Sequence, residues 1–168
     1  MKATITFLAA LWFVLAGFQT VRHSNFSGTW KLDLKKCKNL PPSFRSIEKY
    51  TFVVTQSDDS IVGVATMVGS GQEVTLPPMI YLLSGKEEYS EDTLRFVKRW
   101  SRSEWATTGT KLIIHKRSIQ GQKGKEQTTT QTDVWELKDR STLLMTLTQK
   151  FEKGDSTHSE QRVFRRVR

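Results

Sequence analysis

Short runs of alternating apolar and polar residues follow one another along most of the chain. In the segment 46–56, Tyr50, Phe52 and Val54 alternate with Lys49, Thr51 and Thr55, and only Ile47 and Val53 break the polar pattern. A period of two places these three side chains on one face of a half-buried β-strand. The turn residues at 58–60 and the β-branched run at 61–68 then predict a β-hairpin.

The same pattern continues to the C-terminal end. Strands are predicted around Leu112 and Ile114, along the apolar series Leu143, Met145 and Leu147, and over 156–168. The threonine-rich segment 127–137 fits a strand better than a low-complexity linker. The charged segment 86–98 fits either a capped helix or an exposed hairpin, and we favour the hairpin.

Short turns connect these runs, and no long crossover separates them. This organisation predicts an all-β fold, a single antiparallel up-and-down β-barrel of about eight to ten strands. Closure has a physical reason, because an open sheet leaves two unpaired edges that a barrel removes.

The N-terminus has the layout of a secretory signal peptide. Lys2 precedes an unbroken apolar run from Phe7 to Phe18, and the next charge is Arg22. We assign residues 1–20 to the signal peptide and 25–168 to the barrel domain, and expect a secreted or periplasmic protein. The apolar run is shorter than the ~18 residues of a membrane span, so no transmembrane segment is expected after cleavage. An uncleaved signal anchor is the alternative.

Positive charge is in excess. The chain carries a formal net charge of +9, and removal of residues 1–20 takes away only Lys2, which leaves +8. Such an excess favours anionic surfaces or polysaccharides as partners, although basic residues spread along a chain are also typical of a solvated surface. No motif indicates specific nucleic-acid binding. Cys37 is the single cysteine, which excludes an intramolecular disulfide.

Motifs for catalysis are absent from the sequence. The three histidines, His23, His115 and His158, lack the spacing of a zinc site, and no nucleophile elbow or phosphate-binding loop is present. We therefore expect a non-enzymatic protein without catalytic residues, metal or cofactor.

The segment Phe26-Ser27-Gly28-Thr29-Trp30-Lys31-Leu32 resembles the first strand of the calycin superfamily, which includes lipocalins, fatty-acid-binding proteins and avidins. The resemblance implies that Gly28 and Trp30 form a structural end of the barrel. It also implies that a basic residue of the last strand covers the indole, and Arg162, Arg165 and Arg166 are available. The strand pattern as a whole is similar to that of secreted lipocalin-like proteins of bacteria that have no assigned activity.

Arg162-Val163-Phe164 is similar to the arginine, any residue, tyrosine triplet of fatty-acid-binding proteins. In that family the arginine and tyrosine hold a ligand carboxylate, and phenylalanine here lacks the hydroxyl. Arg162 shares a face with Phe164, so an interior position would require a partner for its charge. An anionic ligand is one such partner, while Glu160, Trp30 or water are the partners that we favour.

These observations lead to the functional hypothesis of a small hydrophobic or acidic-headed ligand bound inside the barrel. The residues expected to line its site are Tyr50, Phe52, Leu112, Ile114, Met145, Leu147, Arg162 and Phe164. The alternative is a barrel filled by its own side chains, acting as a structural module or as an interaction module for proteins or polyanions.

Overall fold

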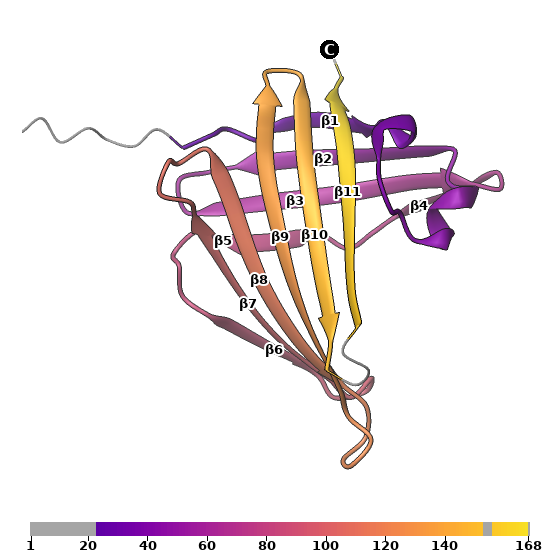
Figure 1. The fold of residues 1–168 in the computed structure, drawn as a ribbon, viewed down its shortest axis with the longest axis vertical. Coiled ribbons are helices and arrows are strands. Elements are labelled where there is room, and N and C mark those ends of the chain that lie inside the picture. Colours follow the sequence, from indigo (N-terminus) through magenta and orange to yellow (C-terminus); the bar gives the residue numbers. More distant parts are fainter. Residues whose placement is uncertain (1–22, 153–155, 168) are drawn as a thin grey trace, which may run out of the picture.

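The computed structural model describes residues 23–152 and 156–167, which form antiparallel strands and two short 3-10 helices, with no α-helix among them (Figure 1). The elements in chain order are β1 Gly28–Leu32, η1 Leu34–Lys36, η2 Pro42–Ser46, β2 Lys49–Gln56, β3 Ser60–Gly69, β4 Gln72–Thr75, β5 Met79–Leu82, β6 Glu88–Asp92, β7 Val97–Trp105, β8 Lys111–Gln120, β9 Gln127–Asp139, β10 Thr142–Phe151 and β11 Ser156–Arg166. The predicted signal peptide lies outside the described residues. Within the described ranges, no helix is long and apolar enough to cross a membrane.

All eleven strands of the described chain belong to one antiparallel sheet. Its order is β4-β3-β2-β1-β11-β10-β9-β8-β7-β6, and β5 pairs with β3 beside this path. Most neighbours in the sheet are also neighbours in the sequence, as the short predicted turns require. The exceptions are the pairing of β3 with β5 and that of β1 with β11, which brings the first and last strands together at Trp30 and Arg166.

The sheet is not closed into the predicted barrel. Its hydrogen-bonded path ends at β4 and β6, and no ladder joins these ends among the described residues. The edge strands explain the difference. The β3 edge is divided between β4, which pairs with 66–69, and β5, which pairs with 60–63. The opposite edge is β6, a five-residue strand with three acidic residues. Short and charged edge strands are a known way in which sheets avoid further pairing.

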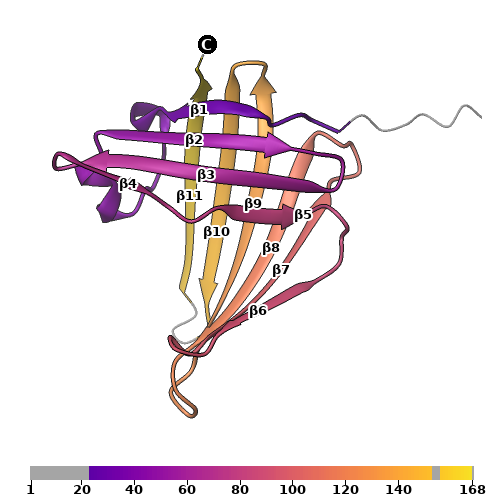
Figure 2. The same cartoon turned by 180° about the vertical axis from the view of Figure 1, so that it is seen from behind.

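The sheet instead bends over itself into two crossing layers. In Figure 1, β1, β2, β3 and β5 run across the upper part of the long strands β8 to β11. Figure 2 shows the same crossing from behind, with the lower part of the long strands extending beyond the first layer. The core lies between the two layers, as in sheets that pack crosswise.

Unlike the closure of the barrel, several individual strands and hairpins are confirmed. The hairpin at 46–68 is formed by β2 and β3, and Tyr50, Phe52 and Val54 of β2 are buried together. The charged segment 86–98 is part of a hairpin between β6 and β7, as favoured above. The threonine-rich segment belongs to β9, the longest strand.

Trp30 closes one end of the core. Its side chain is fully buried, and its indole nitrogen donates a hydrogen bond to the Phe26 carbonyl at 2.9 Å. Of the three arginines considered above, Arg166 covers it, with the guanidinium carbon 4.2 Å from the ring centroid. The Arg166 Nη1 atom donates to the Ser27 carbonyl at 2.7 Å. Gly28 has a φ of +143°, which L side chains rarely adopt, and a Cβ there would lie 2.4 Å from Arg166 Nη1, so both the backbone and the covering arginine favour glycine.

Candidate functional site

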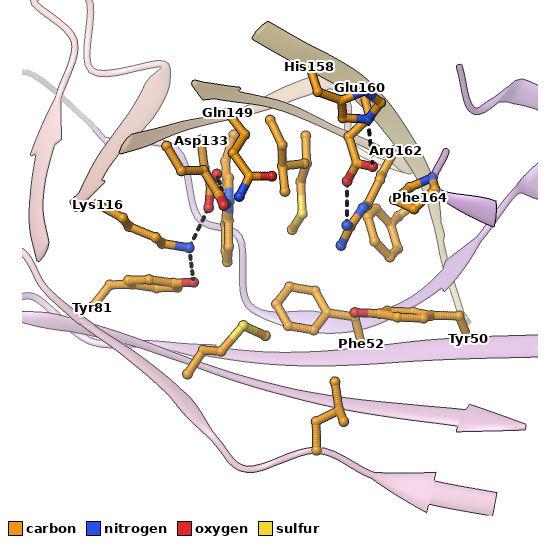
Figure 3. A pocket seen from close by; sticks show the side chains of 17 residues that line it. Tyr50, Phe52, Tyr81, Lys116, Asp133, Gln149, His158, Glu160, Arg162 and Phe164 are labelled. Atoms are coloured by element: carbon orange, nitrogen blue, oxygen red, sulfur yellow. Dashed lines mark hydrogen bonds and ion pairs between the residues drawn. The ribbon is translucent and has the colours of Figure 1, made fainter. Parts of the chain in front are cut away.

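A pocket of about 300 Å³ lies between the two layers. The pocket borders the aromatic core, and residues from both layers line it, as Figure 3 shows. The lining residues are Pro41, Tyr50, Phe52, Leu76, Met79, Tyr81, Lys116, Gln131, Asp133, Trp135, Met145, Leu147, Gln149, His158, Glu160, Arg162 and Phe164. The volume is near the lower end of the range for small-molecule sites.

One wall of the pocket is aromatic and apolar. Phe52 from β2 meets Trp135 edge-on at a centroid distance of 5.6 Å and lies 5.9 Å from Phe164. Tyr50 and Tyr81, both buried, extend this wall to either side of Phe52 (Figure 3). Burial raises the pKa of the Tyr50 hydroxyl, so it stays protonated at neutral pH. These side chains offer rigid apolar surface with hydroxyl groups at its ends.

The opposite wall carries a buried ion pair between β8 and β9. The Lys116 ammonium donates to Asp133 Oδ2 at 2.5 Å and to the Tyr81 hydroxyl at 3.1 Å. Gln131 donates to the other oxygen of Asp133 at 2.6 Å. Burial alone would lower the pKa of Lys116, but Tyr81 and Asp133 outweigh it and leave that pKa raised. The lysine therefore stays charged, and both oxygens of its partner are satisfied.

A second ion pair lies on β11, between Arg162 Nη2 and Glu160 Oε1. The Glu160 side chain is only 5% exposed, and the His158 Nε2 atom lies 3.8 Å from its second oxygen, Oε2. The Arg162 guanidinium also lies over the Phe44 ring, 4.8 Å from its centroid. Glu160 is thus the charge partner that the interior position of Arg162 requires, one of the partners favoured from the sequence.

Six of the eight residues expected around a ligand line this pocket: Tyr50, Phe52, Met145, Leu147, Arg162 and Phe164. Leu112 and Ile114 do not line it. Both are fully buried, because they lie on β8 opposite Trp135 and Asp133 of β9, at the end of the strand where side chains fill the core. The structure thus places both in the core and outside this pocket.

The polar lining residues Lys116, Asp133 and Glu160 were not among the sequence candidates. Strand parity could have found them. Lys116 follows Ile114 by two positions, Asp133 precedes Trp135 by two, and Glu160 precedes Arg162 by two. Residues two apart on a strand face the same side of the sheet. A charged residue two positions from a core residue is therefore expected to point inward.

Other hollows are larger but more superficial. One of about 510 Å³ lies beside the β8–β9 turn, where Phe96 is 54% exposed. The pocket between the layers differs because buried side chains from both layers converge on it. No group of three or more metal-ligating side chains occurs among residues 23–152 and 156–167.

No family model matches the chain, and no curated protein is significantly similar to it. The resemblance to calycins therefore stays a hypothesis based on the segments around Trp30 and Arg162.

Proposed function

We propose that the protein binds a small hydrophobic or amphipathic molecule in the pocket between its two layers, without catalysing a reaction. The observation that carries the proposal is a pocket of about 300 Å³ with one aromatic wall and one wall of ordered polar side chains. An apolar pocket with a few convergent polar groups is the usual form of a small-molecule site. The signal-peptide pattern at 1–20 supports the further proposal that binding takes place outside the cytoplasm.

The two ion pairs in the pocket argue against a ligand with an acidic head. Arg162 has Glu160 as a partner, and Lys116 has Asp133, so neither cation requires a ligand carboxylate. The pocket contributes hydrogen-bonding groups with nearly balanced charge instead of a positive centre. This balance favours the hydrophobic or amphipathic form of the hypothesis over the acidic one.

The alternative is a structural or interaction module. It is favoured by the dense packing around Trp30, Phe26 and Trp135, which belong to one buried hydrophobic cluster. The net charge of +9 would then serve contacts with anionic surfaces or polysaccharides. The two functions differ in one observable, the saturable binding of a small apolar molecule.

A pocket-filling substitution tests the proposal. Titration of the protein with the neutral fluorophore N-phenyl-1-naphthylamine should give saturable binding of one molecule per chain. Leu147→Trp places an indole in the pocket and should weaken this binding at least about tenfold, or ~1.4 kcal/mol. Thr146→Trp is the matched control, because the next residue of β10 faces the other side of the sheet.

Saturable binding that Leu147→Trp reduces and Thr146→Trp leaves intact would support the proposal. Equal binding by all three proteins would place the fluorophore elsewhere on the surface. Absence of saturable binding to the wild-type protein would contradict the proposed function and favour the structural or interaction module.

A further inference from the structure

The buried carboxylate of Glu160 is only half satisfied. Its Oε1 atom forms the ion pair with Arg162, but its Oε2 atom is buried and has no hydrogen-bond partner among the described residues. The His158 ring nitrogen at 3.8 Å is beyond hydrogen-bond distance. Figure 3 shows the carboxylate reaching from β11 toward the pocket, between His158 and Arg162. A buried acceptor without a donor is costly, so this atom calls for a donor that the described residues do not supply.

In the other ion pair of the pocket, between Lys116 and Asp133, both carboxylate oxygens have hydrogen-bond donors. Asp133 is as deeply buried as Glu160, at 5% side-chain exposure, yet one oxygen accepts from Lys116 and the other from Gln131. The incomplete bonding of Glu160 is therefore a local feature of one end of the pocket.

An unmatched donor accompanies the unmatched acceptor. The Arg162 Nε atom is also buried without a hydrogen-bond partner among the described residues. The guanidinium is held in place by Glu160 on one side and by the Phe44 ring on another. Glu160 and Arg162 both line this end of the pocket, and each has one buried polar atom without a partner, an acceptor and a donor.

We infer that this end of the pocket selects a ligand with a neutral head that both donates and accepts hydrogen bonds, such as a hydroxyl or a primary amide. The inference rests on the proposed function, because it assigns the chemistry of the ligand bound there. The head donates to Glu160 Oε2 and accepts from Arg162 Nε, while the apolar part of the ligand lies against Phe52 and Trp135.

Charged heads fit less well for a simple electrostatic reason. A carboxylate accepts from Arg162 but meets the negative charge of Glu160 and leaves Oε2 without a donor. An ammonium donates to Glu160 but meets the positive charge of Arg162 and leaves Nε without an acceptor. In a poorly hydrated pocket both repulsions are stronger than in water.

Competition among ligands that differ only in their heads tests the inference. Decanol, decanamide, decanoic acid and decylamine would each displace N-phenyl-1-naphthylamine from the wild-type protein near neutral pH. The alcohol and the amide should displace it at concentrations about tenfold lower than the acid and the amine, the scale of one unmatched charged hydrogen bond.

Two opposite substitutions then shift the preference in opposite directions. Glu160→Gln removes the negative charge and should move the preference toward decanoic acid, because Arg162 loses its counter-charge. Arg162→Gln should move it toward decylamine. Glu136→Gln is the matched control, because Glu136 lies on the outer face of β9, paired with Lys111 and Lys138, and should leave the preference unchanged.

The outcomes separate the two proposals. Fluorophore binding with no preference among the four heads, or with preference for the acid or the amine, would overturn the inference and leave the proposed function standing. Failure of the wild-type protein to bind any probe would overturn the proposed function first. If one substituted protein does not fold, the other still shows whether the preference follows the remaining charge.

Discussion

Replacing Trp30 with alanine should lower the free energy of unfolding by about 3–5 kcal/mol, the cost of truncating a buried aromatic side chain. The indole is fully buried, bonded to the Phe26 carbonyl and covered by Arg166. Its loss leaves a cavity at the point where the first strand pairs with the last, so the surrounding backbone has little freedom to collapse. Urea unfolding followed by circular dichroism measures the change.

Trp100→Ala is the control for this prediction. Trp100 is half-buried on β7 and contacts Arg117 and Tyr89, which is 53% exposed. Its truncation should cost about 1 kcal/mol or less, as for most surface substitutions. Equal costs for the two tryptophans would mean that Trp30 does not anchor the core.

Breaking the buried pair on the polar wall should have the second-largest effect. Lys116→Met leaves the charge of Asp133 in the interior with only Gln131 as a donor, and should lower the free energy of unfolding by about 3 kcal/mol. This is at the lower end for buried pairs because the Lys116 side chain is 29% exposed. The double substitution Lys116→Met with Asp133→Leu should recover most of the loss, since well-packed apolar residues replace buried pairs at little cost.

The pH dependence follows from the raised pKa of Lys116. A raised pKa in the folded state stabilises the protein below the ordinary lysine pKa of about 10.4, and the contribution is lost as the pH rises through the folded value. Between about pH 6 and 9 Lys116 stays charged, so its contribution to the free energy of unfolding should not change with pH in that range. Lys111→Met is the control, because its pair with Glu136 is at the surface and should contribute under about 1 kcal/mol.

Local pattern predicted the strands because burial of one face imposes a period of two. Tyr50, Phe52 and Val54 illustrate this directly, since all three are buried and Val53 between them is 44% exposed. The hairpins followed as well, because turn residues separate the strands and neighbours in sequence pair. These are local properties that each segment carries by itself.

Closure into a barrel is not a local property, and the sequence reasoning was wrong there. Whether the sheet closes depends on which strands meet at its two ends. Here β5 takes up part of the β3 edge, and β6 is short and acidic. Those pairings depend on how the whole sheet bends, which alternation within one strand does not encode.

Of the residues that line the candidate pocket, the sequence reasoning named the apolar ones on β2, β10 and β11 and Arg162, but not Lys116, Asp133 or Glu160. Apolar strand residues were taken as inward and, apart from Arg162, charged ones as solvated, which holds for most of the surface. Asp133 and Glu160 lie inward because each has a cation within reach, Lys116 across the sheet and Arg162 on the same strand. The pairing of Lys116 with Asp133 depends on the register between β8 and β9, which the sequence alone does not specify. The pairing of Glu160 with Arg162 needs only the spacing of two along one strand, and Glu160 was named as a partner of Arg162 from the sequence.

Nuclear magnetic resonance with methyl-labelled methionine tests the central claim most directly. Met79 and Met145 line the pocket, one from each layer, whereas Met67 does not line it. Binding of decanol should shift the methyl signals of Met79 and Met145 and give contacts from both to the ligand, with Met67 unchanged. Unchanged signals at Met79 and Met145, or a response confined to Met67, would contradict a ligand site between the two layers.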